Sequence, residues 1–273
     1  MVKKRTKKKF KFWKILLFII KIPYYLIKGI IQIIKGIIKL VKIISKKSKE
    51  NKIKKKRESI KAKYVPFKII EIIEGDYEAW FDKTVKSDSQ IGIIIGARGS
   101  GKTAFGIKLL ENIYSKYREK CFAIGFKPNE FPSWIQVISD ISELKNDSWV
   151  LIDEGGILFN SRSSMSNANK LLSQLILISR HKNINILFIS QNSSNLEVNI
   201  LRQADFLVLK TSSLLQKEFE RKIIQKIYSD TQDKFKKHIK DKGLTYIYSG
   251  EFRGFVSNSL PSFWKDEISK SFK

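Results

Sequence analysis

The stretch IGIIIGARGSGKT, residues 91 to 103, decides the fold of this 273-residue chain. The apolar run from Ile91 to Ile95 predicts a buried strand, and TAFGIKLLENIYSKY, which begins at Thr103, has the periodicity of a helix. Between them the sequence matches the phosphate-loop pattern G-x-x-x-x-G-K-[ST], also called Walker A. A strand, a glycine-rich loop and a helix in this order predict a nucleotide-binding α/β domain.

The residues of this loop suit the binding of a nucleoside triphosphate. Glycines let the loop curl so that successive backbone N–H groups point at the phosphates, and the helix N-terminus adds its dipole. Lys102 is expected to reach the β- and γ-phosphates of ATP, and the Thr103 hydroxyl to ligate Mg²⁺. Arg98 has the alternative of facing solvent. The residues expected to bind nucleotide are Gly96, Ala97, Arg98, Gly99, Ser100, Gly101, Lys102 and Thr103.

A second signal lies in SWVLIDEGG, residues 148 to 156. Trp149 to Ile152 predicts a short buried strand that delivers Asp153 and Glu154 at its carboxyl end, where open α/β sheets bind their ligands. Asp153 is placed to hold Mg²⁺ through water, and Glu154 to polarise the attacking water. Two acids at a strand end also occur in solvated turns, but the upstream phosphate loop favours a catalytic Walker B strand.

A third strand, INILFIS at residues 184 to 190, ends in the polar residue Gln191. Gln191 is expected to lie between the loop and the acid strand and to sense the γ-phosphate; an ordinary polar strand end is the alternative. Before this strand, a helix is predicted from about Asn167 to Arg180. Arg180 is interpreted either as a C-terminal cap favoured by the helix dipole or as an arginine finger that reaches a neighbour's ATP.

Further strands are predicted in CFAIGF, from Cys121, and in DFLVLK, from Asp205. The expected order is strand, phosphate loop, helix, strand, helix, acid strand, helix, sensor strand, helix, strand. Such alternation is typical of an α/β fold with a mainly parallel sheet and helices on both faces. Near the C-terminus, LTYIYSGEFRGFVSN predicts a hairpin through Ser249 and Gly250. The segment after it is expected to dock on the body or on a neighbour through Phe263, Trp264, Ile268 and Phe272.

Four features together resemble the FtsK–HerA superfamily of P-loop ATPases: the GARGSGKT loop, the acid strand, the segment SRHKNINILFISQ and the C-terminal hairpin. The resemblance covers about residues 88 to 215. It is closest to the compact genome-packaging ATPases of tailless viruses and to the Zot-like assembly ATPases of filamentous phages.

This resemblance implies the additional-strand, catalytic-glutamate form of the P-loop fold and the hydrolysis of ATP with Mg²⁺. It also implies a homo-oligomeric ring, often hexameric, that drives double-stranded DNA through its centre. Glu154 would be the catalytic base, Gln191 the sensor and Arg180 a finger that acts on the neighbouring subunit. The catalytic residues so implied are Glu154, Lys102, Gln191 and Arg180, and the metal ligands are Thr103 and Asp153.

Positive charge is unevenly distributed along the chain. Residues 1 to 63 hold 23 Lys or Arg residues and two acids, so they carry +21 of the total charge of +27. A basic segment predicts an anionic partner, either lipid headgroups or nucleic acid. The stretch KILLFIIKIPYYLIKGIIQIIKGIIKLVK, residues 14 to 42, favours a membrane, because an arm for nucleic acid needs no such apolar run.

In the same stretch a lysine recurs every seven residues, at Lys14, Lys21, Lys28, Lys35 and Lys42. On a helix these lysines share one face and the other faces are apolar, as in a helix that lies in a membrane interface. A spanning or re-entrant segment and a soluble amphipathic helix are the alternatives. Positive charge on both sides predicts that both ends face the cytoplasm.

Three parts follow from these patterns: a basic membrane-associating arm and linker over residues 1–63, a P-loop ATPase domain over residues 64–260, and a C-terminal docking segment over residues 261–273. Cys121 is the single cysteine, which excludes a disulfide framework and a cysteine-based zinc site. The expected location is the cytoplasmic face of a membrane, with the virion as an alternative.

The predicted function is that of a membrane-tethered ATPase that translocates double-stranded DNA in packaging, export or segregation. A Zot-like assembly or secretion ATPase that acts on protein partners at the membrane is the main alternative, and a P-loop switch or kinase is the third. The expected ligands and partners are ATP, Mg²⁺, double-stranded DNA, an anionic membrane surface contacted by residues 1–63, and further copies of the chain.

Overall fold

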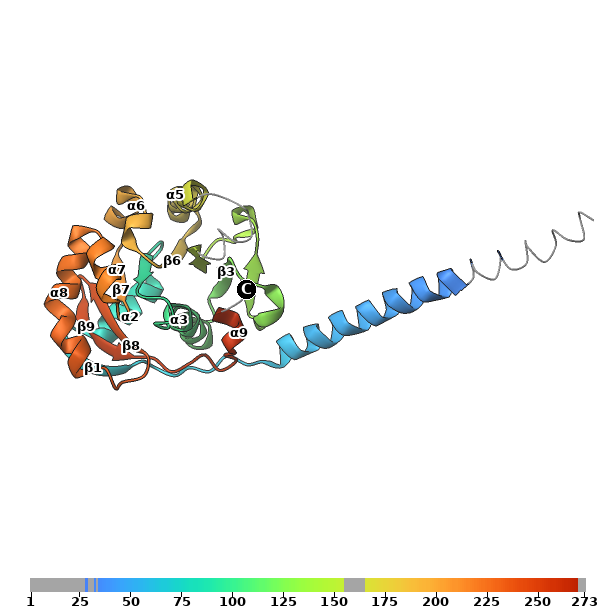
Figure 1. The fold of residues 1–273 in the computed structure, drawn as a ribbon, viewed down its shortest axis with the longest axis horizontal. Coiled ribbons are helices and arrows are strands. Elements are labelled where there is room, and N and C mark those ends of the chain that lie inside the picture. The colour runs from blue at the N-terminus through green and yellow to red at the C-terminus, as the bar shows by residue number, and fades with distance from the viewer. Residues whose placement is uncertain (1–27, 29–31, 33, 155–164, 270–273) are drawn as a thin grey trace, which may run out of the picture. The chain divides into compact units, whose positions relative to one another are not determined.

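The computed structural model describes residues 28, 32, 34–154 and 165–269 (Figure 1). By its internal contacts the chain forms two compact units, Met1–Lys55 and Lys56–Lys273. This division falls ahead of the boundary expected at residue 63, because the end of the linker belongs to the second unit. There the Nε atom of Arg57 donates to the carbonyl oxygen of Phe131 at 2.8 Å.

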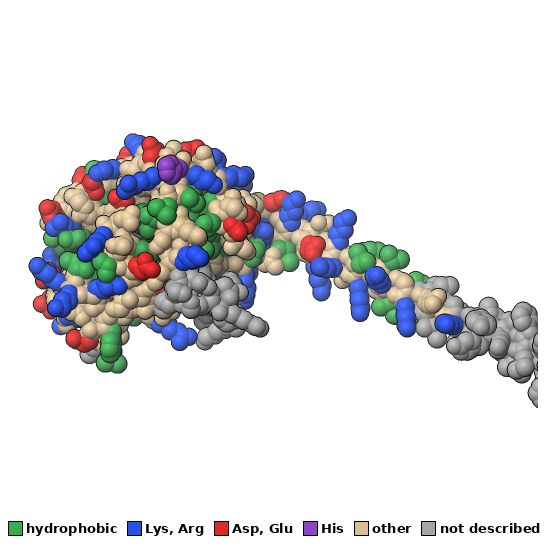
Figure 2. All heavy atoms as spheres, turned by 90° about the horizontal axis from the view of Figure 1, so that it is seen from above, with side chains coloured by type: hydrophobic (Ala, Val, Ile, Leu, Met, Phe, Trp, Pro, Cys, Tyr) green, Lys and Arg blue, Asp and Glu red, His purple; other side chains and the backbone are tan. Residues whose placement is uncertain are grey.

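The first unit contains a basic helix with exposed apolar side chains, part of the helical stretch of residues 34–59. Lys35, Lys39 and Lys42 lie on one side of it at about 100° per residue. Figure 2 shows lysine side chains standing out along this helix with hydrophobic ones between them. No helix in the described part of the chain is long and apolar enough to cross a membrane. Lys14 and Lys21 lie outside the described residues. The large hydrophobic side chains that remain exposed are Ile34, Ile37, Ile38, Leu40, Val41, Ile43 and Ile44.

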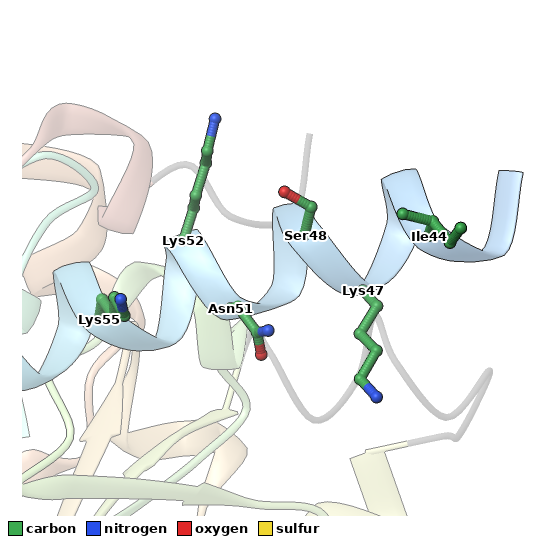
Figure 3. Close-up of a pocket in the computed structure, with 6 residues that line it drawn as sticks. All are labelled: Ile44, Lys47, Ser48, Asn51, Lys52 and Lys55. Atoms are coloured by element: carbon green, nitrogen blue, oxygen red, sulfur yellow. The ribbon is translucent and has the colours of Figure 1, made fainter. Parts of the chain in front are cut away.

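A shallow hollow lies on the surface of the same helix (Figure 3). Figure 3 shows that its lining side chains all leave this one helix, some on one side and some on the other. A single helix provides only one wall, so the hollow does not enclose a ligand. Its lining residues are Ile44, Lys47, Ser48, Asn51, Lys52 and Lys55.

The second unit is built on a nine-stranded sheet with the order β1-β9-β8-β7-β2-β6-β5-β3-β4. The strands are β1 (Lys68–Gly75), β2 (Ile91–Ile95), β3 (Lys120–Ile124), β4 (Ile135–Ile138), β5 (Ser148–Asp153), β6 (Ile184–Ser190), β7 (Phe206–Leu209), β8 (Leu244–Ser249) and β9 (Phe252–Ser257). The helices are α2 (Tyr77–Lys86), α3 (Lys102–Tyr117), α5 (Met165–Lys182), α6 (Val198–Arg202), α7 (Leu214–Phe219), α8 (Lys222–Lys237) and α9 (Asp266–Ser269).

The centre of the sheet is parallel, and β6 lies between β2, which precedes the phosphate loop, and the acid strand β5. One strand inserted between these two is the additional-strand arrangement. The predicted fold class, α/β with a mainly parallel sheet, is therefore confirmed. Strands β8, β9 and β1 extend the sheet in antiparallel fashion beyond β7. The predicted hairpin is formed by β8 and β9, with Ser249 at the end of β8.

The prediction of a helix between β3 and the acid strand β5 is wrong. This stretch holds two 3-10 turns, η1 (Pro128–Glu130) and η2 (Ile141–Glu143), on either side of β4, which pairs in parallel with β3. Pro128 and Pro132 oppose a helix here, because proline lacks a backbone N–H and clashes with the preceding turn. The β-branched residues of IQVI favour a strand instead.

Helices cover both faces of the sheet, and each face has its own hydrophobic core. Helices α2 and α3 cover one face, where Trp80, Phe105 and Leu110 pack with Ile94 and Leu151 of the strands. Helices α5, α6 and α8 cover the other face, where they meet the alternate side chains of the same strands (Figure 1). The central strands are buried on both faces and are accordingly apolar along their length. The sheet is thus packed between two layers of helices, and the candidate site lies at the carboxyl ends of its parallel strands.

The C-terminal segment returns to the body of the same unit, one of the two options that its apolar residues suggest. Phe263 and Ile268 are buried, and the Phe263 ring lies 6.0 Å from that of Phe131 and 5.6 Å from that of Trp134. The helix in this segment, α9, spans only four residues. Phe272 lies outside the described residues.

Candidate nucleotide-binding site

The phosphate loop joins the end of β2 to the start of α3 and passes close to the neighbouring strand β7. Gly96 has φ +157°, and a Cβ at this position would lie 2.6 Å from the Cβ of Lys210. Gly101, which caps the N-terminus of α3, has φ +89°. Glycine adopts a positive φ without strain, and it has no Cβ to collide with a close neighbour. These two residues therefore let the loop turn tightly into the helix N-terminus, which is an anion-binding position.

Lys102 opens α3 and is buried, with 8% of its surface exposed. Its Nζ atom donates to the carbonyl oxygens of Gly96 at 2.6 Å and Ala97 at 2.9 Å, so the ammonium group is held at the loop. Burial lowers the pKa of Lys102, and the carboxylates of Asp153 and Glu154 act in the opposite direction. The structure thus brings together the loop lysine and the two acids that the sequence singled out.

Glu154 follows β5, and its side chain is buried at the carboxyl edge of the sheet. Its Oε2 atom accepts a hydrogen bond from Ser190 Oγ at 2.6 Å. Burial raises the pKa of Glu154, while hydrogen bonds from Ser190, the Gln191 backbone and the Asn195 side chain, and the charge of Lys102, lower it. A carboxylate whose pKa is raised beside a phosphate site has the properties of a general base.

The oxygen atoms expected to bind Mg²⁺ lie at the same edge of the sheet. Thr103 is in the first turn of α3 and Asp153 ends β5, and both are half-buried. No group of three or more His, Cys, Asp or Glu side chains in the described part of the chain could hold a metal ion by itself. Mg²⁺ commonly uses one or two protein oxygens together with substrate phosphates. Thr103 and Asp153 beside a phosphate loop fit this pattern.

Ser100 supports the fit of a phosphate to the loop. Its hydroxyl oxygen is buried and has no hydrogen-bond partner within the described residues. A buried hydroxyl without a partner is unfavourable in free energy. A phosphate oxygen bound in the loop would give this hydroxyl an acceptor.

Ser190, at the end of β6, was not expected in the site from its sequence, and its hydroxyl contacts the Glu154 carboxylate directly. Gln191 follows it and is exposed, and its carbonyl oxygen accepts a hydrogen bond from the Gln216 side chain at 2.5 Å. The polar end of β6 does lie between the loop strand and the acid strand, as expected. Sensing of the γ-phosphate by the Gln191 side chain stays a prediction.

Arg180 lies in the last turn of α5 and is exposed. That end of α5 is near the start of β5, because the backbone N–H of Asp147 donates to the carbonyl oxygen of Lys182 at 2.9 Å. Arg180 is therefore at the edge where the parallel strands begin, opposite to the phosphate loop. It suits the helix dipole as a cap, and a contact with a neighbour's ATP stays a prediction. Arg98 is exposed, which agrees with its solvent-facing alternative.

Lys210 is a buried lysine beneath the phosphate loop that the sequence pattern did not reveal. Its Nζ atom donates to Asn258 Oδ1 at 2.8 Å and to the carbonyl oxygen of Gly243 at 3.0 Å, and burial lowers its pKa to about 7. The backbone N–H of Lys210 donates to the carbonyl oxygen of Ile95 at 2.8 Å, immediately before the loop. Lys210 thus ties the loop to the C-terminal hairpin. In the sequence Lys210 simply follows an apolar strand, and no pattern marks it as buried.

No model of a known protein family matches the chain, and no curated protein matches it. Among solved structures, the DNA-packaging ATPase from Sulfolobus turreted icosahedral virus is 17% identical, with a TM-score of 0.42 over 62% of this chain and 98% of that one. The genome-packaging NTPase from Sulfolobus turreted icosahedral virus 2, in complex with AMP, is 15% identical, with a TM-score of 0.45 over 64% and 100% of the two chains.

The N-terminal domain of zonular occludens toxin from Neisseria meningitidis is also similar, at 15% identity and a TM-score of 0.37 over 68% of this chain and 100% of that one. At such identities the likeness concerns the fold and not the function.

Proposed function

We propose that this chain is a magnesium-dependent ATPase whose second unit is a motor for double-stranded DNA. The observation that supports ATP hydrolysis is the convergence of Lys102, Asp153 and Glu154 at the carboxyl edge of the sheet. The charges of both carboxylates act on the buried Lys102 ammonium group, although Lys102 opens α3 and the two acids lie at the end of β5. A phosphate-binding lysine, a carboxylate for Mg²⁺ and a second carboxylate for the attacking water are the parts that recur in enzymes of phosphoryl transfer.

In the proposed reaction each of these residues has one task. Lys102 and the backbone N–H groups of the loop bind the β- and γ-phosphates. Thr103 and Asp153 hold Mg²⁺, which when bound neutralises negative charge on the phosphoryl oxygens. Glu154 accepts a proton from water while the water oxygen bonds to the γ-phosphorus. The bond from that phosphorus to the β–γ bridging oxygen breaks, and its electron pair leaves with ADP.

Double-stranded DNA as the cargo and a ring of subunits as the working form are supported by the resemblance of the loop, acid-strand and strand-end motifs to FtsK–HerA ATPases. Residues 64–273 carry the remaining +6 of the net charge, a sign that suits a polyanionic partner. An ATPase of this kind is expected to hydrolyse ATP faster when its cargo is bound, because movement along DNA is coupled to turnover.

The test is the rate of ATP hydrolysis by the full chain with and without double-stranded DNA, next to a Lys102→Ala variant. We expect DNA to raise the rate several-fold, and the variant to lose about 99% or more of the activity, since Lys102 binds the transferred phosphoryl group. Hydrolysis that is indifferent to DNA would contradict the cargo and favour the protein-assembly alternative. A chain that hydrolyses no ATP would contradict the ATPase itself.

We further propose that the helix of the first unit binds an anionic membrane surface at the cytoplasmic face. Its exposed isoleucines next to a row of lysines have the composition of an interfacial helix, with the apolar side chains among acyl chains and the lysines at phosphate headgroups. Such a helix would hold the motor at the membrane without spanning it.

Replacement of Lys35, Lys39 and Lys42 by Ala should weaken binding to anionic vesicles about 100-fold, because each lysine near such a surface contributes about 1 kcal/mol. Flotation with phosphatidylserine-containing vesicles measures this loss. The matched control removes the same charge from exposed positions of the second unit.

The control replaces Lys222, Lys226 and Lys240, which are all exposed, by Ala. It should float with the vesicles as well as the unmodified chain does. Equal loss in both triple variants would mean that overall charge, and not the helix, brings the protein to the surface.

A further inference from the structure

Glu220 joins α7 to α8 and is a buried carboxylate, with 4% of its surface exposed. Its Oε2 atom accepts hydrogen bonds from the backbone N–H of Ser193, at 2.6 Å, and from the Ser193 hydroxyl. Its Oε1 atom accepts from the Gln216 side chain at 3.0 Å. Three donors from two different segments therefore compensate the burial of this charge.

The next residue, Arg221, holds the same segment from the other side. Its Nε atom donates to the carbonyl oxygen of Ser193 at 3.0 Å, and its Nη2 atom donates to the carbonyl oxygen of Leu196. The backbone N–H of Arg221 donates to Ser193 Oγ at 2.9 Å. Each polar group of Ser193 thus has a partner at the α7–α8 junction.

The segment held in this way, residues 190–196, is the one that contacts the proposed catalytic base. Ser190 Oγ donates to Glu154 Oε2 at 2.6 Å, and the Gln191 backbone and the Asn195 side chain also lower the pKa of Glu154 by hydrogen bonding. Gln216 bridges the two ends of the arrangement, because its Nε2 atom also donates to the carbonyl oxygen of Gln191 at 2.5 Å. Contacts therefore run without a break from Glu220 through Ser193 and its neighbours to Glu154.

We propose that Glu220 is a positioning residue for ATP hydrolysis, which fixes residues 190–196 so that they hold the Glu154 carboxylate in place. This role rests on the proposed ATPase function and extends it to the α7–α8 junction. Small displacements of a catalytic group reduce the rate of the chemical step strongly. Glu220 also acts on Lys102 through its charge, so an effect on nucleotide binding is the competing outcome.

The experiment compares Glu220→Gln with Glu218→Gln in the full chain. Gln keeps the size of the side chain, but an NH2 group replaces one carboxylate oxygen and cannot accept a hydrogen bond. Ser193 or Gln216 therefore loses an acceptor at this position. Glu218 lies in the last turn of α7, two residues before Glu220, and is exposed. Its substitution removes the same charge from the surface.

We expect Glu220→Gln to lower kcat about tenfold to a hundredfold. The Kd for a non-hydrolysable ATP analogue should stay within about twofold of the unmodified value. A change in kcat without a change in Kd distinguishes positioning of Glu154 from an effect on nucleotide binding. Glu218→Gln should change neither quantity. Hydrogen exchange adds a readout that needs no hydrolysis: the amide of Ser193, which donates to Glu220, should exchange faster in Glu220→Gln only.

Three results would overturn the role of Glu220. The first is a kcat and an analogue Kd that both equal those of the unmodified chain. The second is a loss of analogue binding with kcat unchanged, which would place the effect on Lys102. The third is unchanged exchange at Ser193. An unmodified chain that binds the analogue but hydrolyses no ATP would instead refute the proposed ATPase, so the two failures are distinguishable.

Discussion

Replacement of Glu154 by Gln should reduce the rate of ATP hydrolysis about 10²- to 10⁴-fold, the range that a positioned general base contributes. The amide oxygen of Gln can still accept the hydrogen bond from Ser190 Oγ, so the side chain keeps its place. It cannot accept a proton from water. Nucleotide binding should persist, because Lys102 and the loop glycines remain.

The stability of the Glu154→Gln variant should be equal to or above that of the unmodified chain at pH 7. Burial raises the pKa of Glu154 in the folded state, so the folded state binds more protons than the unfolded state between the two pKa values. Stability from this group is therefore lost as the pH rises through the folded pKa. A neutral Gln removes that penalty.

Single-turnover hydrolysis, binding of an ATP analogue and thermal unfolding together check this prediction. The control is Glu197→Gln, since Glu197 is exposed at the start of α6. Hydrolysis by Glu154→Gln within a few-fold of the unmodified rate would mean that another group takes the proton.

Replacement of Glu111 by Ala should lower the free energy of unfolding by about 3 to 5 kcal/mol, as expected when one partner of a buried ion pair is removed. The Lys108 Nζ atom lies 2.9 Å from Glu111 Oε2, and the two side chains are 1% and 0% exposed. Glu111 also accepts hydrogen bonds from the backbone N–H groups of Lys63 and Ser262, both at 3.1 Å. Ala would leave the Lys108 charge buried without its carboxylate partner and would remove the acceptor of these two backbone donors.

Urea unfolding of the full chain measures the loss. The matched control is Asp233→Ala, because Asp233 forms an ion pair with Lys236 at the same spacing along a helix but with both side chains exposed, at 97% and 66%. That variant should keep nearly the same midpoint, as exposed pairs add little to stability. A loss below about 1 kcal/mol in Glu111→Ala would contradict the stabilising role of the buried pair.

The Glu111 contacts also matter for the architecture of the second unit. They attach the end of the linker, at Lys63, and the C-terminal segment, at Ser262, to α3, which carries the loop residues Lys102 and Thr103 at its start. The segment that leads to the basic arm is thus fastened to the helix of the proposed nucleotide site.

The sequence predicted the candidate site best where residues that are adjacent in the chain act together. The loop from Gly96 to Thr103 and the pair Asp153 and Glu154 could be assigned because each motif is contiguous and its strand and helix neighbours have clear periodicities. The additional strand β6 was also predicted correctly in its place. The edge strand β4 was missed because its four residues are too few to show a period, and a helix was expected there from the alternation of elements.

The sequence by itself determined the α/β fold, the phosphate loop and the two acids, since these depend on local chemistry and on the burial of apolar runs. The tertiary structure alone decided which distant residues support them. Ser190 meets Glu154 across 36 positions of the chain, and Ser193 meets Glu220 across 27. Lys210 packs beneath Gly96 because β7 pairs with β2. Such contacts follow from the order of strands in the sheet, and a serine, glutamate or lysine that forms one has no local pattern to mark it.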